Sequence, residues 1–235
     1  MTMITCKWNR LTVCQAQFST PSMQEVLQDM DSAMQNPLRI LKDDPTSTVV
    51  VVNIDGHPVV VKRANTKGVI HFLRRLVCPS RAKKNWHFAK VLKSSNIHTF
   101  EPMAYLEERM GPFKRRSYLI CSLINGTDAL TFFSLQANQG QWESVAKNIV
   151  GLIQQLAAKG LSHRDLNLSN ILLVEGKPYL IDLDSMRQHR LLPLIKRALY
   201  HEVKRFMENW QDYPDISPRV AEIFNEYFKE RGFVW

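Results

Sequence analysis

The feature that most constrains this chain is a pair of short polar motifs in its second half. Residues 163–170 read His-Arg-Asp-Leu-Asn-Leu-Ser-Asn, and residues 181–184 read Ile-Asp-Leu-Asp. A helical pattern over residues 142–159, ended by a glycine, precedes the first motif. Between the motifs, two apolar runs flank a Glu-Gly-Lys-Pro turn, which predicts a β-hairpin. The expected order is therefore helix, polar loop, hairpin and second polar motif.

The polar residues of these motifs have the spacing of a phosphoryl-transfer site. Asp165 is expected to accept the proton of a substrate hydroxyl, which makes it the candidate catalytic base. Asn170 and Asp182 are expected to hold Mg²⁺ against the phosphates of ATP, because oxygen ligands suit this cation and the transferring group carries negative charge. The alternative is a structural loop whose Asp and Asn side chains only cap turns. The agreement between the motifs and their surroundings favours the chemistry.

The region before these motifs reads as a small antiparallel sheet. Residues 39–42 and 49–54 are expected strands, and Asp55-Gly56 predicts a tight hairpin into a third strand that ends at Lys62. This is the layout of a kinase N-lobe, in which a loop between two strands covers the phosphates and the third strand carries a lysine to them. Lys62 is the candidate for that catalytic and nucleotide-binding lysine. The alternative is a strand-end lysine that reaches solvent.

Two parts of such a site are missing from the sequence. The expected phosphate-covering loop has no glycine, so the hydroxyls of residues 46–48 are expected to replace backbone contacts in part. A glutamate that pairs with the lysine is also expected, yet no carboxylate occurs from Arg63 to Phe100. The alternatives left open for the partner of Lys62 are Asp182, Glu101, Glu107, or ordering of the lysine by nucleotide alone.

Between the two halves, residues 117–126 are expected to form a strand that continues into a connector. By its position in the chain, the backbone at Ser122 to Ile124 is expected to meet the adenine edge of ATP; the alternative is an ordinary buried strand. A helix is expected near residues 22–34, stopped by Pro37. The expected domains are an N-terminal extension without an assigned role at 1–37, a kinase N-lobe at 38–125 and a kinase C-lobe at 126–235.

Composition limits the class of protein. The chain has 235 residues, is 45% hydrophobic and is long enough to bury a core. No stretch approaches the ~20 apolar residues of a membrane-spanning helix, and the first ten residues lack the apolar centre of a signal peptide, so a cytoplasmic location is expected. The four cysteines lack C-x-x-C spacing, so neither a zinc site nor a disulfide framework is indicated.

The net charge of +9 favours an anionic partner, such as a nucleic acid, an acidic lipid surface or a phosphorylated substrate. Nine Lys and Arg residues fall in the carboxylate-free stretch from Arg63 to Phe100. This stretch is either a solvated basic helix face or an electrostatic docking surface.

The two motifs also carry a family resemblance. The runs H-R-D-L-N-L-S-N-I-L-L and Y-L-I-D-L-D-S-M-R resemble the bacterial lipopolysaccharide kinase family, which includes the Kdo kinases and the core heptose kinases. Ordinary protein kinases have Lys at the position of Asn167 and D-F-G at residues 182–184. Residues 81–86 and 97–102 resemble the stretch before the fourth strand of the family, although Asn85 stands where the family often has a glutamate. The resemblance covers roughly residues 38–210.

The resemblance implies an α+β, protein-kinase-like bilobal fold with a small antiparallel-sheet N-lobe and a mostly helical C-lobe. It implies ATP-dependent phosphorylation of a Kdo or heptose hydroxyl of the lipopolysaccharide inner core, with Mg²⁺ as cofactor. The expected partners are the lipopolysaccharide core or a lipid A precursor and an anionic membrane surface. The expected location is cytoplasmic and peripheral, on the inner face of the inner membrane, and no nucleic acid is expected.

Two alternatives stay open. An atypical Ser, Thr or Tyr protein kinase is disfavoured because the segment from Asp184 to Tyr213 continues into a helix without an A-P-E-like anchor. A non-catalytic nucleotide-binding protein is favoured by the missing glycines and glutamate, and disfavoured by the intact Asp165, Asn170 and Asp182.

Overall fold

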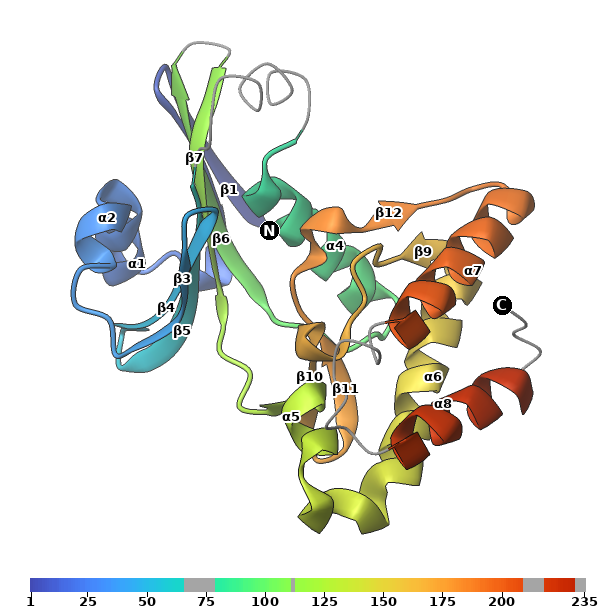
Figure 1. Cartoon of the computed structure of the whole chain (residues 1–235). Coiled ribbons are helices and arrows are strands. Elements are labelled where there is room, and N and C mark those ends of the chain that lie inside the picture. The colour runs from blue at the N-terminus through green and yellow to red at the C-terminus, as the bar shows by residue number, and fades with distance from the viewer. Residues whose placement is uncertain (66–78, 111–112, 209–217, 231–235) are drawn as a thin grey trace. The chain divides into compact units, whose positions relative to one another are not determined.

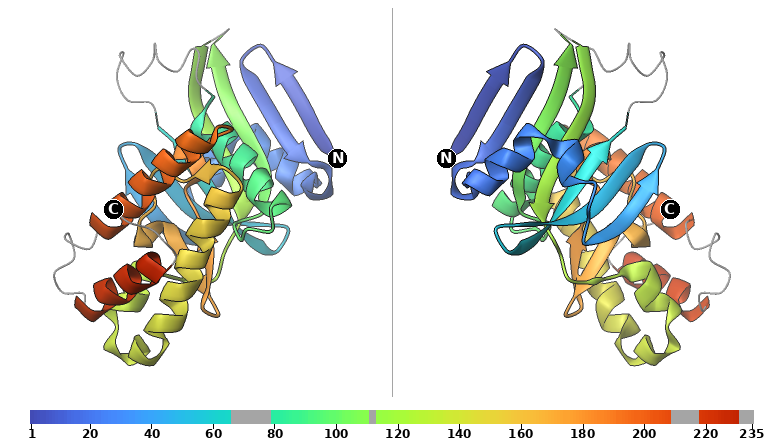
Figure 2. Two further views of the ribbon diagram at one scale, coloured as in Figure 1. Left: turned by 90° about the vertical axis from the view of Figure 1, so that its right-hand side faces the viewer. Right: turned by 90° about the vertical axis from the view of Figure 1, so that its left-hand side faces the viewer.

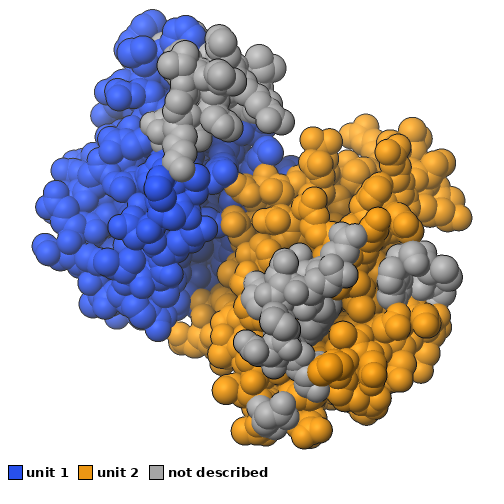
Figure 3. All heavy atoms as spheres, in the orientation of Figure 1, with its two compact units in different colours: residues 1–90, 100–123 blue, residues 91–99, 124–235 orange. Residues whose placement is uncertain are grey.

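The computed structural model describes residues 1–65, 79–110, 113–208 and 218–230. The chain forms two compact units, which Figure 3 distinguishes by colour. Unit 1 consists of Met1–Lys90 and Phe100–Leu123, and unit 2 consists of Val91–Thr99 and Ile124–Trp235. Strands dominate the first unit and helices dominate the second (Figure 1).

Unit 1 contains one antiparallel sheet of seven strands in the order β1-β2-β6-β7-β5-β4-β3. The strands are β1 (Thr2–Lys7), β2 (Arg10–Gln15), β3 (Arg39–Asp44), β4 (Ser47–Ile54), β5 (His57–Ala64), β6 (Pro102–Met110) and β7 (Phe113–Ser122). The hairpin predicted at Asp55-Gly56 joins β4 to β5, and both turn residues have the positive φ angles of a type I′ turn.

The first 37 residues belong to unit 1 and contain two strands that the sequence did not reveal. Every residue of β1 after Thr2 is exposed, so the sequence of this strand lacks the alternation of buried and exposed residues that predicts a strand. Its antiparallel pairing with β2 stabilises it instead. The helix expected near residues 22–34 is divided into α1 (Pro21–Gln28) and α2 (Met30–Ala33), because Asp29 leaves the helical conformation and caps α2 through Ser32 N–H.

Helices cover both faces of this sheet: α1 and α2 lie on one face, and α4 (Arg81–Ser94) lies on the other (Figure 2). Apolar side chains of α1 and α2 pack on the sheet, where Val61 and Ile120 are fully buried. Asp31 of α2 accepts hydrogen bonds from Arg63 (3.1 Å), Arg116 (2.6 Å) and Tyr118 (3.0 Å) of the sheet. Arg63 is therefore part of an internal ion-pair network and not of a free basic surface.

Unit 2 is built around the helix α6 (Trp142–Ala158), whose buried side chains include Trp142, Ile149 and Ile153. Its other α-helices are α5 (Ala129–Ser134), α7 (Leu192–Glu208) and α8 (Pro218–Glu230). Unit 2 also contains the 3-10 helices η2 (Gln136–Gln141), η3 (Leu168–Asn170) and η4 (Leu183–Ser185), whereas η1 (Ala16–Phe18) lies in unit 1. Phe206, Phe224 and Phe228 pack together between α7 and α8, as expected for core aromatics.

The remaining strands of unit 2 are short. They form a three-stranded sheet, β11-β10-β8, and a two-stranded sheet, β12-β9. Their bounds are β8 (Thr127–Asp128), β9 (Leu161–Ser162), β10 (Ile171–Val174), β11 (Lys177–Leu180) and β12 (Arg187–Gln188). The hairpin predicted between the two motifs is β10-β11. Gly160, with φ +65°, ends α6 as predicted, and a Cβ there would lie 2.5 Å from the His189 carbonyl oxygen.

No helix in the described ranges combines the length and the apolar character needed to cross a membrane.

Candidate active site

The first polar motif forms the loop between β9 and β10, and it lies against the second motif. The fully buried His163 shares a hydrogen bond of 3.0 Å between its Nε2 and the Ile181 carbonyl oxygen. The Ile181 N–H donates to the Asn170 carbonyl oxygen, also at 3.0 Å. These two bonds join both ends of residues 163–170, which we call the catalytic loop, to the residue before Asp182.

Within the catalytic loop, Asn170 holds the backbone of Asp165. Its Nδ2 donates to the Asp165 carbonyl oxygen at 2.9 Å, and its own N–H donates to Asn167 Oδ1 at 2.9 Å. The Asp165 side chain is nevertheless 52% exposed. The structure therefore fixes the backbone of the candidate base and leaves its carboxylate accessible to a substrate.

Two residues of the motifs have a left-handed backbone that non-glycine residues seldom adopt. Arg164 has φ +65°, and Asp182 has φ +57° with ψ +59°. Each such residue costs about 1–3 kcal/mol, and residues of this kind gather at functional sites. Asp182 precedes η4, whose first residue, Leu183, is fully buried and anchors the segment.

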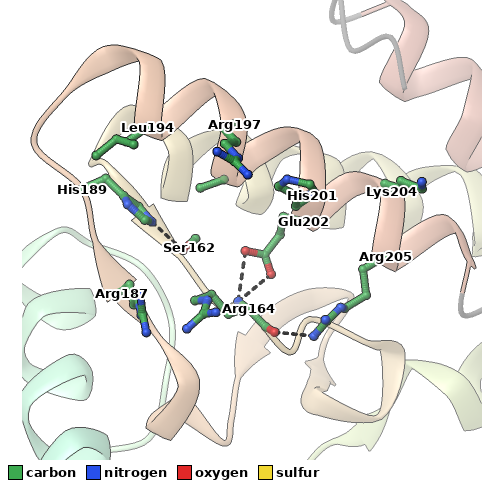
Figure 4. A pocket seen from close by; sticks show the side chains of 11 residues that line it. Ser162, Arg164, Arg187, His189, Leu194, Arg197, His201, Glu202, Lys204 and Arg205 are labelled. Carbon is green, nitrogen blue, oxygen red and sulfur yellow. Dashed lines mark hydrogen bonds between the residues drawn. The ribbon is translucent and has the colours of Figure 1, made fainter.

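The helix α7 holds the strained Arg164 from both sides (Figure 4). The Arg164 N–H donates to both carboxylate oxygens of Glu202, at 2.9 and 3.1 Å, and the Arg164 carbonyl oxygen accepts from Arg205 Nη1 at 2.6 Å. The same Arg205 nitrogen lies 4.0 Å from Asp165 Oδ1. Glu202 and Arg205 are therefore positioning residues for the catalytic loop.

The sequence reasoning missed Glu202, although a signal was present. Ile195, Leu199, Glu202 and Phe206 follow helical spacing, so a carboxylate interrupts an apolar helix face. A carboxylate in that place needs a buried partner. Burial raises the pKa of Glu202, and the hydrogen bond from the Arg164 N–H offsets part of the rise.

Lys62 lies on β5 in unit 1, paired with Val49 of β4 and Leu119 of β7. Burial raises the pKa of the nearby Cys121 thiol to about 12, and the positive charge of Lys62 opposes that rise. Leu119 pairs in turn with Tyr105 of β6, so Lys62, Leu119 and Tyr105 lie side by side on neighbouring strands and their side chains share one face. The Tyr105 ring packs edge-on against Trp86 of α4, with 5.4 Å between the ring centroids. The face that carries Lys62 is therefore the face that α4 covers.

Glu107, one of the alternatives for the partner of Lys62, has hydrogen-bond donors of its own. Glu107 is fully buried, and it accepts hydrogen bonds from Ser80 Oγ at 2.6 Å and from Arg109 Nη2 at 2.5 Å. Burial alone would raise the pKa of Glu107, but these two donors lower it below its usual value. Glu107 thus binds Ser80, the residue before α4, and Arg109 of its own strand. The choice among Asp182, Glu101, Glu107 and ordering by nucleotide stays open.

Asn85, the residue at the position where the family often has a glutamate, is buried on α4. Its side-chain amide donates to the Arg81 carbonyl oxygen at 3.0 Å.

The expectation for the phosphate-covering loop is corrected at the turn between β3 and β4. The Asp44 carboxylate accepts from the N–H groups of Thr46 (2.6 Å) and Ser47 (2.8 Å) and from the Thr46 hydroxyl, while the Thr48 hydroxyl donates to Asp43 at 3.0 Å. The hydrogen bond from the Thr46 hydroxyl is the main cause of the lowered pKa of Asp44. The Thr46 and Thr48 hydroxyls are engaged within the turn, so they do not stand in for glycine.

The two expected adenine-binding residues belong to different units: Ser122 to unit 1 and Ile124 to unit 2. Ser122 donates its N–H to the Glu101 carbonyl oxygen at 2.9 Å and accepts from the Glu101 N–H through its hydroxyl, also at 2.9 Å. The Ile124 carbonyl oxygen accepts from the Gly126 N–H at 3.1 Å. An adenine-binding role for Ser122 and Ile124 stays a prediction.

Within the described part of the chain, no three His, Cys, Asp or Glu residues gather as a metal cluster. A magnesium ion that bridges phosphates needs fewer protein ligands, because it keeps several waters and binds through one or two protein oxygens. Asn170 and Asp182 supply that type of donor.

Comparison with known proteins decides the family. The family model described as "Lipopolysaccharide kinase (Kdo/WaaP) family" matches residues 52–222, which is most of the chain and includes Lys62 and both polar motifs. The chain belongs to the lipopolysaccharide kinase family. Members of this family are phosphotransferases by that description, so the resemblance seen in the sequence is confirmed.

A solved structure shows the same fold. The structure titled "WaaP in complex with acyl carrier protein" matches with a TM-score of 0.62 and 16% identity, and the match covers 94% of this chain and 89% of that one. The PknI kinase domain of Mycobacterium tuberculosis matches with a TM-score of 0.45 and 15% identity over 73% of each chain. No curated protein sequence matches this lipopolysaccharide kinase. The WaaP match confirms the predicted α+β, kinase-like fold.

Proposed function

We propose that this lipopolysaccharide kinase transfers the γ-phosphoryl group of ATP to a Kdo or heptose hydroxyl of the lipopolysaccharide inner core. The observation that carries the proposal is the hydrogen-bonded unit formed by the catalytic loop and the Ile181-Asp182 segment. It gives Asp165 an accessible carboxylate on a fixed backbone, which is what a general base for a hydroxyl requires.

In this proposal, Asp165 takes the proton from the attacking sugar hydroxyl at a carboxylate oxygen. Asn170 and Asp182 hold Mg²⁺, which, when bound, neutralises charge on the transferring phosphoryl group. The left-handed backbone of Asp182 and the side-chain hydrogen bond of Asn170 hold these two residues in place.

Lys62 is proposed to neutralise the phosphates of ATP, on the basis of its place on β5. The backbone at Ser122 and Ile124 is proposed to meet the adenine ring. Both roles are assigned to single residues because the chain belongs to a kinase family, in which groups of this kind bind ATP.

We propose further that the enzyme acts at the cytoplasmic face of the inner membrane and binds that anionic surface peripherally. The start of α7 supports this: Leu191 and Leu192 are 63% and 64% exposed and are followed by Lys196 and Arg197. Exposed leucines flanked by cations suit the boundary of an anionic bilayer. Of the basic stretch expected to dock there, Arg81, Lys83 and Lys84 lie on α4, while Lys67, Arg74 and Arg75 lie outside the described residues.

Replacing Leu191 and Leu192 together by Gln should weaken co-sedimentation with anionic liposomes several-fold, because apolar area leaves the bilayer. Leu135→Gln is the control, since Leu135 is 51% exposed in the same unit and has no Lys or Arg close in sequence. Equal binding by the double variant and the control would contradict membrane contact by α7.

Phosphoryl transfer to purified cores of defined structure tests the proposed reaction. The expected product is a core with one added phosphate, detected by mass spectrometry and assigned to one sugar hydroxyl by NMR. Transfer to peptide Ser, Thr or Tyr in place of the core would establish the protein-kinase alternative. Tight Mg-ATP binding without transfer to any acceptor would establish the non-catalytic alternative.

A further inference from the structure

Unit 2 contains a cavity of about 700 Å³ beside the catalytic loop. Residues from the catalytic loop, the β12-β9 ribbon and α7 line it (Figure 4). Seven of the lining side chains are basic: Arg164, Arg187, His189, Arg197, His201, Lys204 and Arg205. The only carboxylate among the described lining residues is Glu202. We call this cavity the basic pocket.

Glu202 is a single carboxylate among five Lys and Arg side chains in the described lining, so the basic pocket keeps an excess of positive charge. Its two carboxylate oxygens accept from the Arg164 N–H, so their hydrogen bonds go to backbone and not to a guanidinium group. The side chain is also nearly fully buried, at 6% exposure. Within the described part of the chain, the guanidinium groups of Arg187 and Arg197 make no hydrogen bond or ion pair. Several close, uncompensated cations in a cavity attract an anion.

The architecture of the basic pocket holds the cations near one another. Arg187 pairs with Ser162 across the β12-β9 ribbon, and His189 Nε2 lies 2.9 Å from Ser162 Oγ. Arg197 and Arg205 are eight residues apart on α7, which places them about two turns apart along the helix axis. Guanidinium groups bind carboxylate and phosphate in a two-pronged geometry.

The basic pocket also lies next to the proposed base. Arg164, which lines it, directly precedes Asp165, and Arg205 Nη1 is 4.0 Å from Asp165 Oδ1. A sugar whose hydroxyl reaches Asp165 can therefore extend an acidic substituent into the basic pocket.

We propose that the basic pocket binds a carboxylate or phosphate group of the acceptor sugar and so orients the hydroxyl toward Asp165. The proposal rests on the proposed function, because it assigns the acceptor side of that site. It assigns Arg187 and Arg197 as specificity-determining residues that bind the acidic substituent.

Arg187→Gln and Arg197→Gln, singly and together, test the proposal. Both side chains are exposed, so the variants should fold, and thermal unfolding checks this. Lys229→Gln is the matched control, because it removes the same charge from an exposed helical position of unit 2, on α8, outside the pocket lining. Arg164 and Arg205 are left unchanged, since their contacts hold the catalytic loop.

Direct binding is the first readout and needs no turnover. Calorimetry of the wild-type protein with free Kdo, a sugar carboxylate, and with a sugar phosphate identifies which acid group binds. Each arginine variant should bind the preferred ligand at least about tenfold more weakly, as expected when a charge-assisted hydrogen bond is lost. Lys229→Gln should stay within about twofold. Absence of binding of either ligand to the wild-type protein, or equal binding by all variants, would overturn the proposal.

Kinetics with core acceptors give the second readout. The arginine variants should raise the KM for the acceptor at least about tenfold and leave the KM for ATP unchanged, because the lost contacts are to the acceptor alone. An acceptor whose acid group is esterified or removed should abolish the difference between wild-type and variant proteins. Equal acceptor KM values across the set, with active wild-type enzyme, would refute the basic pocket but not the kinase.

The two readouts separate the proposals. If the wild-type protein transfers no phosphate to any core yet loses sugar-acid binding in the arginine variants, the proposed function fails and the basic pocket stands.

Discussion

Polar groups are bound differently in two parts of the molecule, the turn between β3 and β4 and the catalytic loop. In the turn, the side chains of Asp43 and Asp44 bind neighbouring N–H and hydroxyl groups, so the local polar groups satisfy one another. In the catalytic loop, two residues of α7, the buried Glu202 and the exposed Arg205, bind the loop backbone, and the Asp165 side chain stays exposed. The difference indicates where chemistry is possible, because a group already bound within its own turn is not available to a ligand.

The carboxylates of Asp44 and Glu202, one from each region, have pKa values shifted in opposite directions. Hydrogen bonds within the exposed turn lower the pKa of Asp44, whereas burial against the catalytic loop raises the pKa of Glu202. A shift in pKa between the folded and unfolded states makes stability depend on pH. The two regions should therefore respond to acid in opposite directions.

The largest effect is expected at the catalytic loop itself. Asp165→Ala should lower turnover by about 10²–10⁴-fold or more and leave Mg-ATP affinity nearly unchanged, because the residue acts on the acceptor hydroxyl. Asp182→Ala should instead weaken metal-dependent ATP binding. Calorimetry with Mg-ATP distinguishes the two, and equal loss of affinity in both variants would contradict the assigned roles.

A large effect is also expected in unit 1. Lys62→Ala should reduce the single-turnover rate by at least ~10²-fold if the lysine neutralises phosphate charge. Lys42→Ala is the control, since Lys42 is an exposed strand lysine that pairs with Asp44 at 2.9 Å. A rate close to wild type for Lys62→Ala would show that it is only a strand-end lysine.

A smaller effect is expected where α7 holds Arg164. Glu202→Ala should destabilise the protein by about 1–3 kcal/mol, because the Arg164 N–H loses its acceptor. It should also lower kcat more than it raises the KM for ATP, since the loop next to Asp165 loosens. Urea unfolding and steady-state kinetics measure these changes.

The pH dependence of Glu202 follows from its raised pKa. The folded state binds the proton more tightly than the unfolded state, so this contribution to stability is fully present below the ordinary value of 4.5 and is lost as pH rises through the folded value. Glu202→Gln should remove this decline. A wild-type and a Gln variant whose unfolding free energies keep a constant difference from pH 4 upward would argue against a raised pKa.

The smallest effect is expected at Asp44, whose side chain is partly exposed. Its pKa lies below the ordinary 3.8, so its contribution to stability is present above that value and is lost as pH falls through the folded value. Asp44→Asn should slightly lower the midpoint of urea unfolding at neutral pH, and the difference should vanish in acid. ATP affinity should not change, and a marked loss of it would restore a phosphate-binding role for this turn.

Much of the local structure could be predicted from short stretches of sequence. Asp55-Gly56 specifies a hairpin because both turn positions need positive φ, which Asp, Asn and Gly accept more readily than other residues. In the turn at Glu175-Gly176, both residues also have positive φ, but only the glycine is of this kind. The catalytic loop was recognisable because its chemistry requires Asp165, Asn170 and Asp182 at fixed spacing. The family and the fold followed from these motifs.

Only the tertiary structure shows which residues far apart in the chain become hydrogen-bond partners. The residues joined by the hydrogen bond between the Arg164 N–H and Glu202 are 38 positions apart in the chain, and those joined by the hydrogen bond between Ser80 and Glu107 are 27 positions apart. The edge strand β1 has no apolar pattern of its own. The sequence determines backbone conformation where neighbouring residues impose it, but the partner of a buried charge depends on which distant elements pack together, and that is settled only when the whole unit folds.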